Sequence, residues 1–347
     1  MVLYILVVFF IVSPHFPATG NPHWFFRTAD FVRLQSLFVQ LVLLLLLVFL
    51  EENFTTFTWI LLTLLVASMI YQLFKVVPYS SIFPQKKSEA AHEGCVSVFA
   101  GNVLQTNTQH SKFIDEIKRF DPDIVLAMET NQEWENSLSE IEQQYPYSVK
   151  VPLENFYGMH AYSKIALENV EVKYQIEDDK PSIFFDFPMK DHLPIFFCCL
   201  HPAPPSPTEN ETSKERDAEL LLTGKKIRKA DKPTVVCGDM NDVVWSRTTR
   251  LFKKMTGMID PRVGRGFFST YNANYFFLRF PLDHLFHTRD LFVGRMERSN
   301  HFGSDHFAMY YEIHHKKRVS TPTNPKLNGE DKEEIEEIIE EGKNNGN

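Results

Sequence analysis

The sequence lacks the charge balance of a protein that coats nucleic acid. Acidic residues outnumber basic ones by 44 to 36, so the chain of 347 residues carries a formal net charge of −8. Proteins that hold long nucleic acids through the phosphate backbone usually carry a basic excess. The balance therefore disfavours such a protein, although it allows a local basic patch.

Two common motif classes are also missing. The four cysteines, Cys95, Cys198, Cys199 and Cys237, show no CxxC spacing, which disfavours a zinc ribbon. Each lies in an apolar, β-prone run, so we expect buried thiols rather than disulfides, and the cysteines do not define the cellular compartment. No GxxxxGK phosphate loop is present, which disfavours the transfer of phosphate from ATP.

Long apolar runs are present near the N-terminus, and they predict membrane-spanning helices. Extended back through Phe31, the run at residues 38–50 reaches the roughly twenty residues that a span requires. A second run covers residues 57–74. Residues 1–14 are apolar over a shorter length and lack the basic start of a signal peptide, so we interpret them as a shortened third span. A buried helical hairpin in a soluble protein is the alternative.

The charges beside these runs bear on orientation. Arg33 precedes the run at 38–50, Glu51 and Glu52 follow it, and Lys75 follows the last run. The positive-inside rule then places the chain after Lys75 in the cytoplasm. Because the difference is only a few charges, an outward orientation stays open.

The composition divides the chain into four parts. We assign residues 1–77 to the membrane anchor and residues 78–93 to a polar linker that contains prolines. From 94 to 316 short β-prone runs alternate with helical ones, which predicts a sandwich of sheets with helices outside. Residues 317–347 are acidic and rich in asparagine, so we predict a mostly disordered tail that holds at most a short helix.

Polar residues stand at the ends of six apolar runs in the third part. They are Asn102, Glu129, His201, Asp239 with Asn241, Asp283 with His284, and the trio Ser304, Asp305 and His306. One such residue is usually a turn former or a helix cap. Six together, which mix carboxylates, amides and histidines, predict one site at the rim of the sheets. Hard oxygen ligands suit Mg²⁺, and histidines beside it can contact phosphate, which favours hydrolysis of a phosphate ester.

The motifs around these residues resemble the ordered set of the endonuclease/exonuclease/phosphatase superfamily, which has the deoxyribonuclease-I-like fold. "GDMN" is similar to its GD-aromatic-N signature, and "GSDHFAM" to its terminal SDH motif. "AGNV", "AMET", "LHPAPPSP" and "PLDHLF" stand in the family's order over about 94–316. The apolar spans before this domain resemble the membrane-anchored bacterial branch. The resemblance implies an α+β fold, a four-layer αββα sandwich preceded by transmembrane helices.

The resemblance also implies a metal site. Glu129 would be the principal ligand of Mg²⁺ or Mn²⁺, with Asn102 beside it. Asp305 would be a further ligand of metal or water. Asp239 would activate the attacking water or hold a second metal ion.

The remaining roles implied by the resemblance concern the phosphate. Asn241 and His201 would hold phosphate oxygens. His306 would contact the scissile phosphate and stabilise its developing charge, while Asp283 would orient His306 and keep it cationic. The segment "YGMHAYSK" resembles the substrate-side strand of the family, but we expect a structural role for its His160. The aromatic residues of "STYNANYFFLRFP" are either core or a substrate rim near the membrane.

We therefore predict an integral protein of a bacterial cell membrane. It would be a metal-dependent phosphoesterase that hydrolyses a lipid-linked or another membrane-proximal phosphate ester. The alternatives are a Mg²⁺-dependent nuclease and a non-catalytic membrane scaffold. Nucleic acid is not the favoured partner, and the scaffold is disfavoured because every core position of the site is filled.

Overall fold

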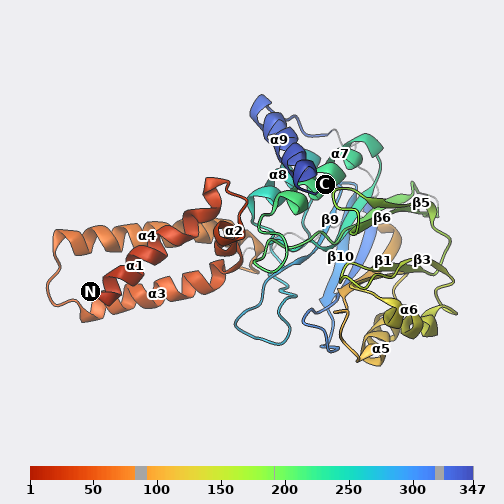
Figure 1. The fold of residues 1–347 in the computed structure, drawn as a ribbon, viewed down its shortest axis with the longest axis horizontal. Coiled ribbons are helices and arrows are strands. Elements are labelled where there is room, and N and C mark those ends of the chain that lie inside the picture. The colour runs from red at the N-terminus through yellow and green to blue at the C-terminus, as the bar shows by residue number, and fades with distance from the viewer. Residues whose placement is uncertain (83–91, 191, 317–323, 347) are drawn as a thin grey trace.

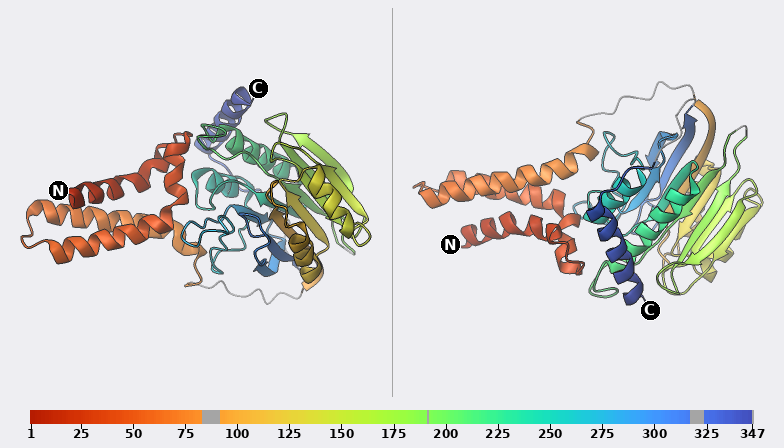
Figure 2. Two further views of the ribbon diagram at one scale, coloured as in Figure 1. Left: turned by 60° about the horizontal axis from the view of Figure 1, so that its bottom comes forward. Right: turned by 90° about the horizontal axis from the view of Figure 1, so that it is seen from above.

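The computed structural model describes residues 1–82, 92–190, 192–316 and 324–346. It shows a bundle of helices that projects from one side of a layered domain (Figures 1 and 2). Most of the predicted linker at 78–93 lies outside the described residues. Within it, a short 3₁₀ helix, η2 (Val77–Tyr79), leaves the bundle, and the first strand of the domain begins at His92.

Three apolar helical segments form the bundle. They are α1 (Val2–Val12) with the 3₁₀ helix η1 (Ser13–Thr19), α3 (Arg33–Leu50) and α4 (Thr56–Val76). All three are long and apolar enough to cross a membrane, the first only when η1 is counted with α1. The short helix α2 (Trp24–Phe31) lies at the end of the bundle that meets the domain (Figure 1).

The bundle encloses polar side chains beside an apolar cluster, and it presents apolar side chains on its outer surface. The amide of Gln72 donates to the Gln40 amide oxygen at 2.6 Å, and Gln40 donates to the Ser68 hydroxyl at 3.0 Å. The outward side chains of Phe49 and Phe74 are 78% and 79% exposed. Buried polar pairs between helices that present apolar outer faces are typical of membrane bundles. This arrangement disfavours the soluble hairpin.

The domain contains two sheets. The six-stranded sheet has the order β10-β11-β1-β2-β4-β3, and the five-stranded sheet has the order β5-β6-β7-β8-β9. The strands of the first sheet are β1 (His92–Asn102), β2 (Ile124–Met128), β3 (Tyr147–Val151), β4 (Met159–Ser163), β10 (Leu291–Arg298) and β11 (Met309–Lys316). Those of the second are β5 (Glu168–Tyr174), β6 (Pro181–Phe187), β7 (Ile195–Cys199), β8 (Thr234–Asp239) and β9 (Asp283–His287).

Helices cover the outer face of each sheet. The elements are α5 (His110–Phe120), α6 (Gln132–Leu138) and η3 (Ser139–Ile141) on the first sheet, and α7 (Lys214–Ala230) and α8 (Arg247–Thr256) on the second. Helix α9 (Gly329–Asn345) packs against α7. Alternation along β1 shows why: Val98 points into the core between the sheets, while Phe99 packs against Phe113 of α5. The predicted αββα sandwich is confirmed.

Parallel pairing brings four strand ends to one edge of the sandwich. In the first sheet β1 and β2 are parallel, with Asn102 opposite Met128. In the second sheet β7 and β8 are parallel, with Cys199 opposite Cys237. The antiparallel strand β9 begins opposite the end of β8, so Asp283 faces Asp239. Polar residues that follow these strands must therefore meet at one edge.

Two predictions about the chain are wrong. Gly329–Asn345 is a helix, α9, with a capping box between Asn328 and Asp331, where we predicted disorder. Its Ile335 and Ile339 are buried in the same cluster as residues of α7 and α8. The acidic segment therefore also carries apolar residues that pack against the domain. The thiol Cys95 is exposed rather than buried, because β1 is still at the margin of the sheet there, whereas Cys198, Cys199 and Cys237 are buried free thiols.

The domain and the bundle share a buried junction. The indole of Trp245 donates to the Asp30 carbonyl at 2.8 Å, and Arg27 of α2 pairs with Asp217 of α7 at 3.2 Å. Trp245 belongs to an apolar cluster with Val76 of α4 and Leu282 of the domain. The junction therefore fixes the domain against the end of the bundle.

Candidate active site

The amide of Asn102 joins the two sheets at the edge where the parallel strands end. Its nitrogen donates to Oε1 of Glu129 at 2.7 Å and to Oδ2 of Asp239 at 3.2 Å. Glu129 follows β2 in the same sheet, while Asp239 ends β8 in the other. One polar link thus crosses the gap between two layers whose interior is otherwise apolar.

The backbone at this edge is unusual at three residues. Glu129 and Asn241 adopt positive φ angles of 62° and 48°, which few residues other than glycine tolerate without cost. Gly238 has a φ of 141°, and a Cβ there would lie 1.9 Å from the Leu200 carbonyl oxygen. Only glycine therefore fits before Asp239. Strained residues are often held at functional sites.

Asp239 stays ionised although it is buried. Burial alone would raise its pKa, but the positive charge of His306 and the hydrogen bonds from Asn241 and Asn102 outweigh burial and hold the pKa below its ordinary value. The backbone N–H of Asn241 donates to Oδ1 of Asp239 at 3.0 Å. The carboxylate is therefore a fixed acceptor.

Glu129 behaves differently. Burial raises the pKa of Glu129 to about 7, against the opposing effect of the Asn102 hydrogen bond. Its second oxygen accepts from the backbone N–H of Gln105 at 3.3 Å. A carboxylate with so high a pKa gains much from a nearby positive charge.

His306 and Asp283 form the other half of the site. Nδ1 of His306 lies 2.8 Å from Oδ2 of Asp283, and Nε2 lies 3.5 Å from Oδ2 of Asp239. Burial lowers the pKa of His306, but the charges of Asp283 and Asp239 outweigh it and raise the pKa to about 10. The imidazole is therefore cationic at neutral pH. The hydroxyl of Ser304 accepts from the His306 backbone and donates to the Asn102 carbonyl, which ties both halves together.

His201 lies at the same edge but is neutral. Its Nε2 is 3.9 Å from Oδ2 of Asp239, and its ring lies 5.2 Å from that of Tyr157. Burial lowers the pKa of His201 to about 4. Its Nδ1 is buried without a hydrogen-bond partner among the described residues. The ring can thus donate or accept one hydrogen bond as a neutral group.

Two predicted residues are less central. The side-chain nitrogen of Asn241 donates to the Pro202 carbonyl at 3.0 Å, so one of its two hydrogens is already engaged. Asp305 is half-buried at the rim, where its backbone carbonyl accepts from Ala273 at 2.6 Å. His160 is not in the cluster: it lies inside β4 beside Tyr162, and burial lowers its pKa to about 3.

The oxygen set fits a divalent cation. The carboxylates of Glu129 and Asp239 converge on the amide nitrogen of Asn102, and carboxylate oxygens suit Mg²⁺ or Mn²⁺. The amide oxygen of Asn102 accepts from the backbone N–H of Leu104 at 3.0 Å, so it would join them as a ligand only if the side-chain amide turned over. A second group, Asp239, Asp283 and His306, also offers ligand atoms within 4.8 Å of one another. The imidazole in that group already binds Asp283 through Nδ1, so it fits an ion pair better than a metal. We favour the oxygen set as the metal site.

Sequence reasoning missed the residues that support this edge from a distance. Arg216 of α7 donates to the Asn241 carbonyl at 2.7 Å and pairs with Asp217 at 2.9 Å and with Asp242 at 3.5 Å. The ring of Tyr271 lies 4.9 Å from that of His306. Arg216 sits in a charged run that is typical of a wet helix face, so no local signal marks it. Tyr271 lies in the aromatic segment before the Asp283 motif, which was the available signal.

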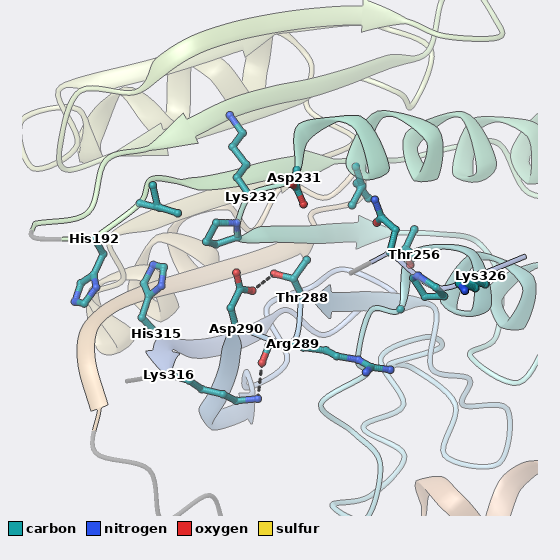
Figure 3. A pocket seen from close by; sticks show the side chains of 16 residues that line it. His192, Asp231, Lys232, Thr256, Thr288, Arg289, Asp290, His315, Lys316 and Lys326 are labelled. Carbon is teal, nitrogen blue, oxygen red and sulfur yellow. Dashed lines mark hydrogen bonds between the residues drawn. The ribbon is translucent and has the colours of Figure 1, made fainter. Parts of the chain in front are cut away.

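A large cavity lies elsewhere in the domain. It has a volume of about 690 Å³ and is lined by residues such as Lys232, Thr288 and Lys316 (Figure 3). These residues lie just before β8, after β9 and at the end of β11. The cavity is therefore at the opposite end of the strands from Asp239 and His306. We place the candidate active site where the polar side chains converge, not where the cavity is large.

Solved structures with this arrangement share the fold at low sequence identity. TDP2 from D. rerio in complex with a single-strand DNA product has a TM-score of 0.54 and 14% identity, over 64% of this chain and 99% of that chain. An endonuclease/exonuclease/phosphatase from Bacteroides vulgatus has a TM-score of 0.53 and 17% identity, over 65% and 100%. The human Nocturnin catalytic domain with bound sulfate has a TM-score of 0.51 and 15% identity, over 65% and 96%.

Comparison of the sequence with family models identifies the family. No curated protein matches the chain. A family model described as Endonuclease/Exonuclease/phosphatase family matches residues 96–306, which is more than half of the chain. The match spans every residue of the site, from Asn102 to His306. The chain therefore belongs to the endonuclease/exonuclease/phosphatase family.

Proposed function

We propose that the protein is a membrane-anchored, metal-dependent phosphoesterase that hydrolyses a lipid-linked or another membrane-proximal phosphate ester. One observation carries the membrane part. The segment that holds Asp239 and Asn241 continues directly into Val243, Val244 and Trp245, which pack against the end of the helical bundle. The candidate site therefore lies beside the anchor rather than at the far side of the domain.

The anchor is proposed to span a bilayer. Its three segments have mean hydropathies of 1.9, 2.2 and 2.0. Their outer faces are apolar, while the pair Gln40 and Gln72 is enclosed. A soluble bundle would instead present a polar outer face.

The proposed roles at the site follow from charge. Glu129, Asn102 and Asp239 would hold the divalent ion, with Asp305 at the rim as a further ligand of metal or water. The ion, when bound, would neutralise charge on a phosphoryl oxygen. The His306 cation would donate from Nε2 to the phosphate and stabilise charge that develops in the transition state, while Asp283 keeps the imidazole oriented and protonated.

The remaining groups handle water and orientation. Asp239 is ionised and faces His306, so it can accept a hydrogen bond from the attacking water. Neutral His201 and the free hydrogen of Asn241 would bind non-reacting phosphate oxygens. Each charged group at the site is thus proposed to have a role that its protonation state allows.

The test is a substrate panel with the full chain in lipid nanodiscs. The panel contains phosphatidic acid, a phosphoinositide, a polyprenyl phosphate, plasmid DNA and single-stranded DNA, each with Mg²⁺ or Mn²⁺. We expect hydrolysis of at least one lipid phosphate ester and loss of that activity in Glu129→Ala and His306→Ala. Asp290→Asn, a change at the other end of β9, is the matched control. Cleavage of DNA with no hydrolysis of any lipid would overturn the proposal in favour of a nuclease.

A further inference from the structure

Residues 271–280 form a hairpin with an exposed aromatic tip, here called the aromatic loop. Backbone hydrogen bonds between Tyr271 and Phe280 close its base. At its tip Phe276 and Phe277 are 73% and 81% exposed, and Tyr275 and Leu278 are exposed beside them. Contiguous apolar side chains of this size are rarely left in water without a partner.

The base of the aromatic loop rests on the candidate site. The backbone N–H of Ala273 donates to the Asp305 carbonyl at 2.6 Å. The ring of Tyr271 packs against that of His306, and the next residue, Phe307, donates its N–H to the Thr270 carbonyl at 3.0 Å. A movement of the loop would therefore reach the two residues that flank the reacting phosphate.

The tip of the aromatic loop lies beside the anchor. Gln35, in the first turn of α3, donates from its amide to the Phe277 carbonyl at 2.8 Å. The ring of Phe31 packs edge-on against that of Phe280, with 6.1 Å between the centroids. In Figure 1 the loop, drawn in blue-green, lies at the end of the bundle that meets the domain. A bilayer that surrounds α3 would begin at this level.

The charges around the tip match a membrane surface. The guanidinium of Arg279 lies 5.5 Å from the centroid of Phe276, and its Nη2 donates to the Ala273 carbonyl at 3.2 Å. Arg298 lies 4.3 Å from the centroid of Phe307 in the same region. Aromatic side chains above a basic collar are the pattern of an interfacial anchor, since the rings enter the acyl boundary while the cations meet anionic head groups.

We propose that the aromatic loop inserts its tip into the surface of the same bilayer that holds the anchor, and so presents membrane-borne phosphate esters to His306. This inference rests on the proposed function for its substrate, but the insertion itself does not depend on any turnover. The partner is a lipid surface rather than a second protein, because the tip is bound to Gln35 at the start of α3, a helix that we propose to span the bilayer.

The first experiment measures insertion. Phe277→Cys in a Cys95→Ser background, labelled with the fluorophore NBD, is reconstituted in nanodiscs that contain lipids spin-labelled on the acyl chain. We expect a blue shift and strong quenching, whereas the same label at Val172→Cys on the exposed strand β5 stays unquenched. Equal, weak quenching at both positions would overturn the proposal, and so would quenching that appears only when protein concentration drives a second copy onto the loop.

The second experiment measures the consequence for substrates. The double variant Phe276→Ser with Phe277→Ser is compared with Val170→Ser with Val172→Ser, a pair of exposed apolar residues on β5 that are 43% and 38% exposed. Since removal of one buried phenylalanine costs more than a factor of ten in an equilibrium, we expect kcat/KM on a vesicle-borne phosphate ester to fall by roughly tenfold or more. Hydrolysis of a soluble phosphate ester should be unchanged.

The outcomes separate the two proposals. Equal loss on soluble and vesicle-borne esters would overturn the presentation of lipid substrates by the loop. Absence of hydrolysis of every phosphate ester by the unmodified chain would overturn the proposed function, while the quenching result would still decide whether the loop enters the bilayer.

Discussion

Oδ2 of Asp283 lies 2.8 Å from Nδ1 of His306, and both side chains are buried at the edge where the two sheets meet. The pair joins β9 to the segment before β11, so it links two sheets as well as two charges. Burial raises the pKa of Asp283, but its charge and that of Asp239 hold the pKa of His306 at about 10. The imidazole therefore owes its charge to this pair.

Replacing Asp283 by asparagine should weaken the enzyme and change its pH profile. In the unmodified protein the imidazolium persists until the pH rises through about 10, so an activity that needs it is lost only above that value. In Asp283→Asn the charge that opposes the effect of burial on His306 is smaller, so the pKa of His306 falls. The alkaline limb of the pH–rate profile therefore moves to lower pH. We expect kcat to fall by about 10²- to 10⁴-fold at neutral pH. The check is a pH–rate profile, with Asp290→Asn as the control whose profile should not move.

Replacing Glu129 by glutamine should weaken the binding of the metal ion, so that a higher metal concentration is required for activity. Changes outside the ligand shell of a metal commonly cost about 10- to 100-fold in affinity, so loss of a ligand charge should cost at least that much. Chelation should abolish activity in the unmodified chain, and added Mg²⁺ or Mn²⁺ should restore it. Titration of Mn²⁺ followed by electron paramagnetic resonance measures binding without turnover. Glu133→Gln, an exposed change on α6, is the control, and equal affinities in both variants would contradict the metal assignment.

Replacing Trp245 should loosen the junction between domain and anchor. The side chain is 1% exposed and donates to the Asp30 carbonyl. Trp245→Ala should lower the free energy of unfolding by about 3–5 kcal/mol. Trp245→Phe keeps most of the volume and leaves one buried carbonyl unpaired, so its cost should be about 1–3 kcal/mol. Denaturation of the full chain in detergent, followed by circular dichroism, measures both. Equal stability of all three proteins would show that the junction is not formed.

Replacing Glu219 by glutamine should flatten the pH dependence of stability. Glu219 of α7 is buried, accepts from the Ser182 hydroxyl at 2.6 Å, and has a pKa that burial raises to about 7. Because the unfolded chain releases this proton near 4.5, the free energy of unfolding falls as pH rises from about 4.5 to 7. The full shift corresponds to roughly 3 kcal/mol. Denaturation at pH 5 and pH 8 should show a smaller difference in Glu219→Gln, and an unchanged difference would contradict the assignment.

The interior strands were predictable because their sequences consist almost entirely of apolar residues. The runs that became β2, β7 and β8 are buried on both faces, and they read as continuous apolar segments. Strand β3 was missed because Tyr147–Val151 is a half-exposed edge strand. Helix α8 was missed although Ser246 accepts from the N–H of Thr249, a cap that the sequence could have suggested.

The candidate site could be predicted for residues that stand at the ends of strands. It could not be predicted for residues that reach it from a distant helix. Asn102, Glu129 and Asp239 converge because parallel strands end at one edge. The buried contact of Arg216 with Asn241 depends on how α7 lies over the second sheet. The role of every residue at this edge is a proposal, and those of Asn241 and Asp305 have the least support, because the first is engaged with Pro202 and the second lies at the rim.

The number of segments in the bundle has a consequence for sidedness. With α1, α3 and α4 all crossing, the chain traverses the bilayer an odd number of times before it enters the domain. The turn at Glu51 and Glu52 lies at the far end of the bundle (Figure 1), where Glu51 accepts from the Tyr4 hydroxyl. In the proposed membrane arrangement Tyr4 and that turn would share one compartment, and the candidate site would occupy the other. A single accessibility measurement on a cysteine placed at Glu52 would then assign the sidedness of the whole molecule.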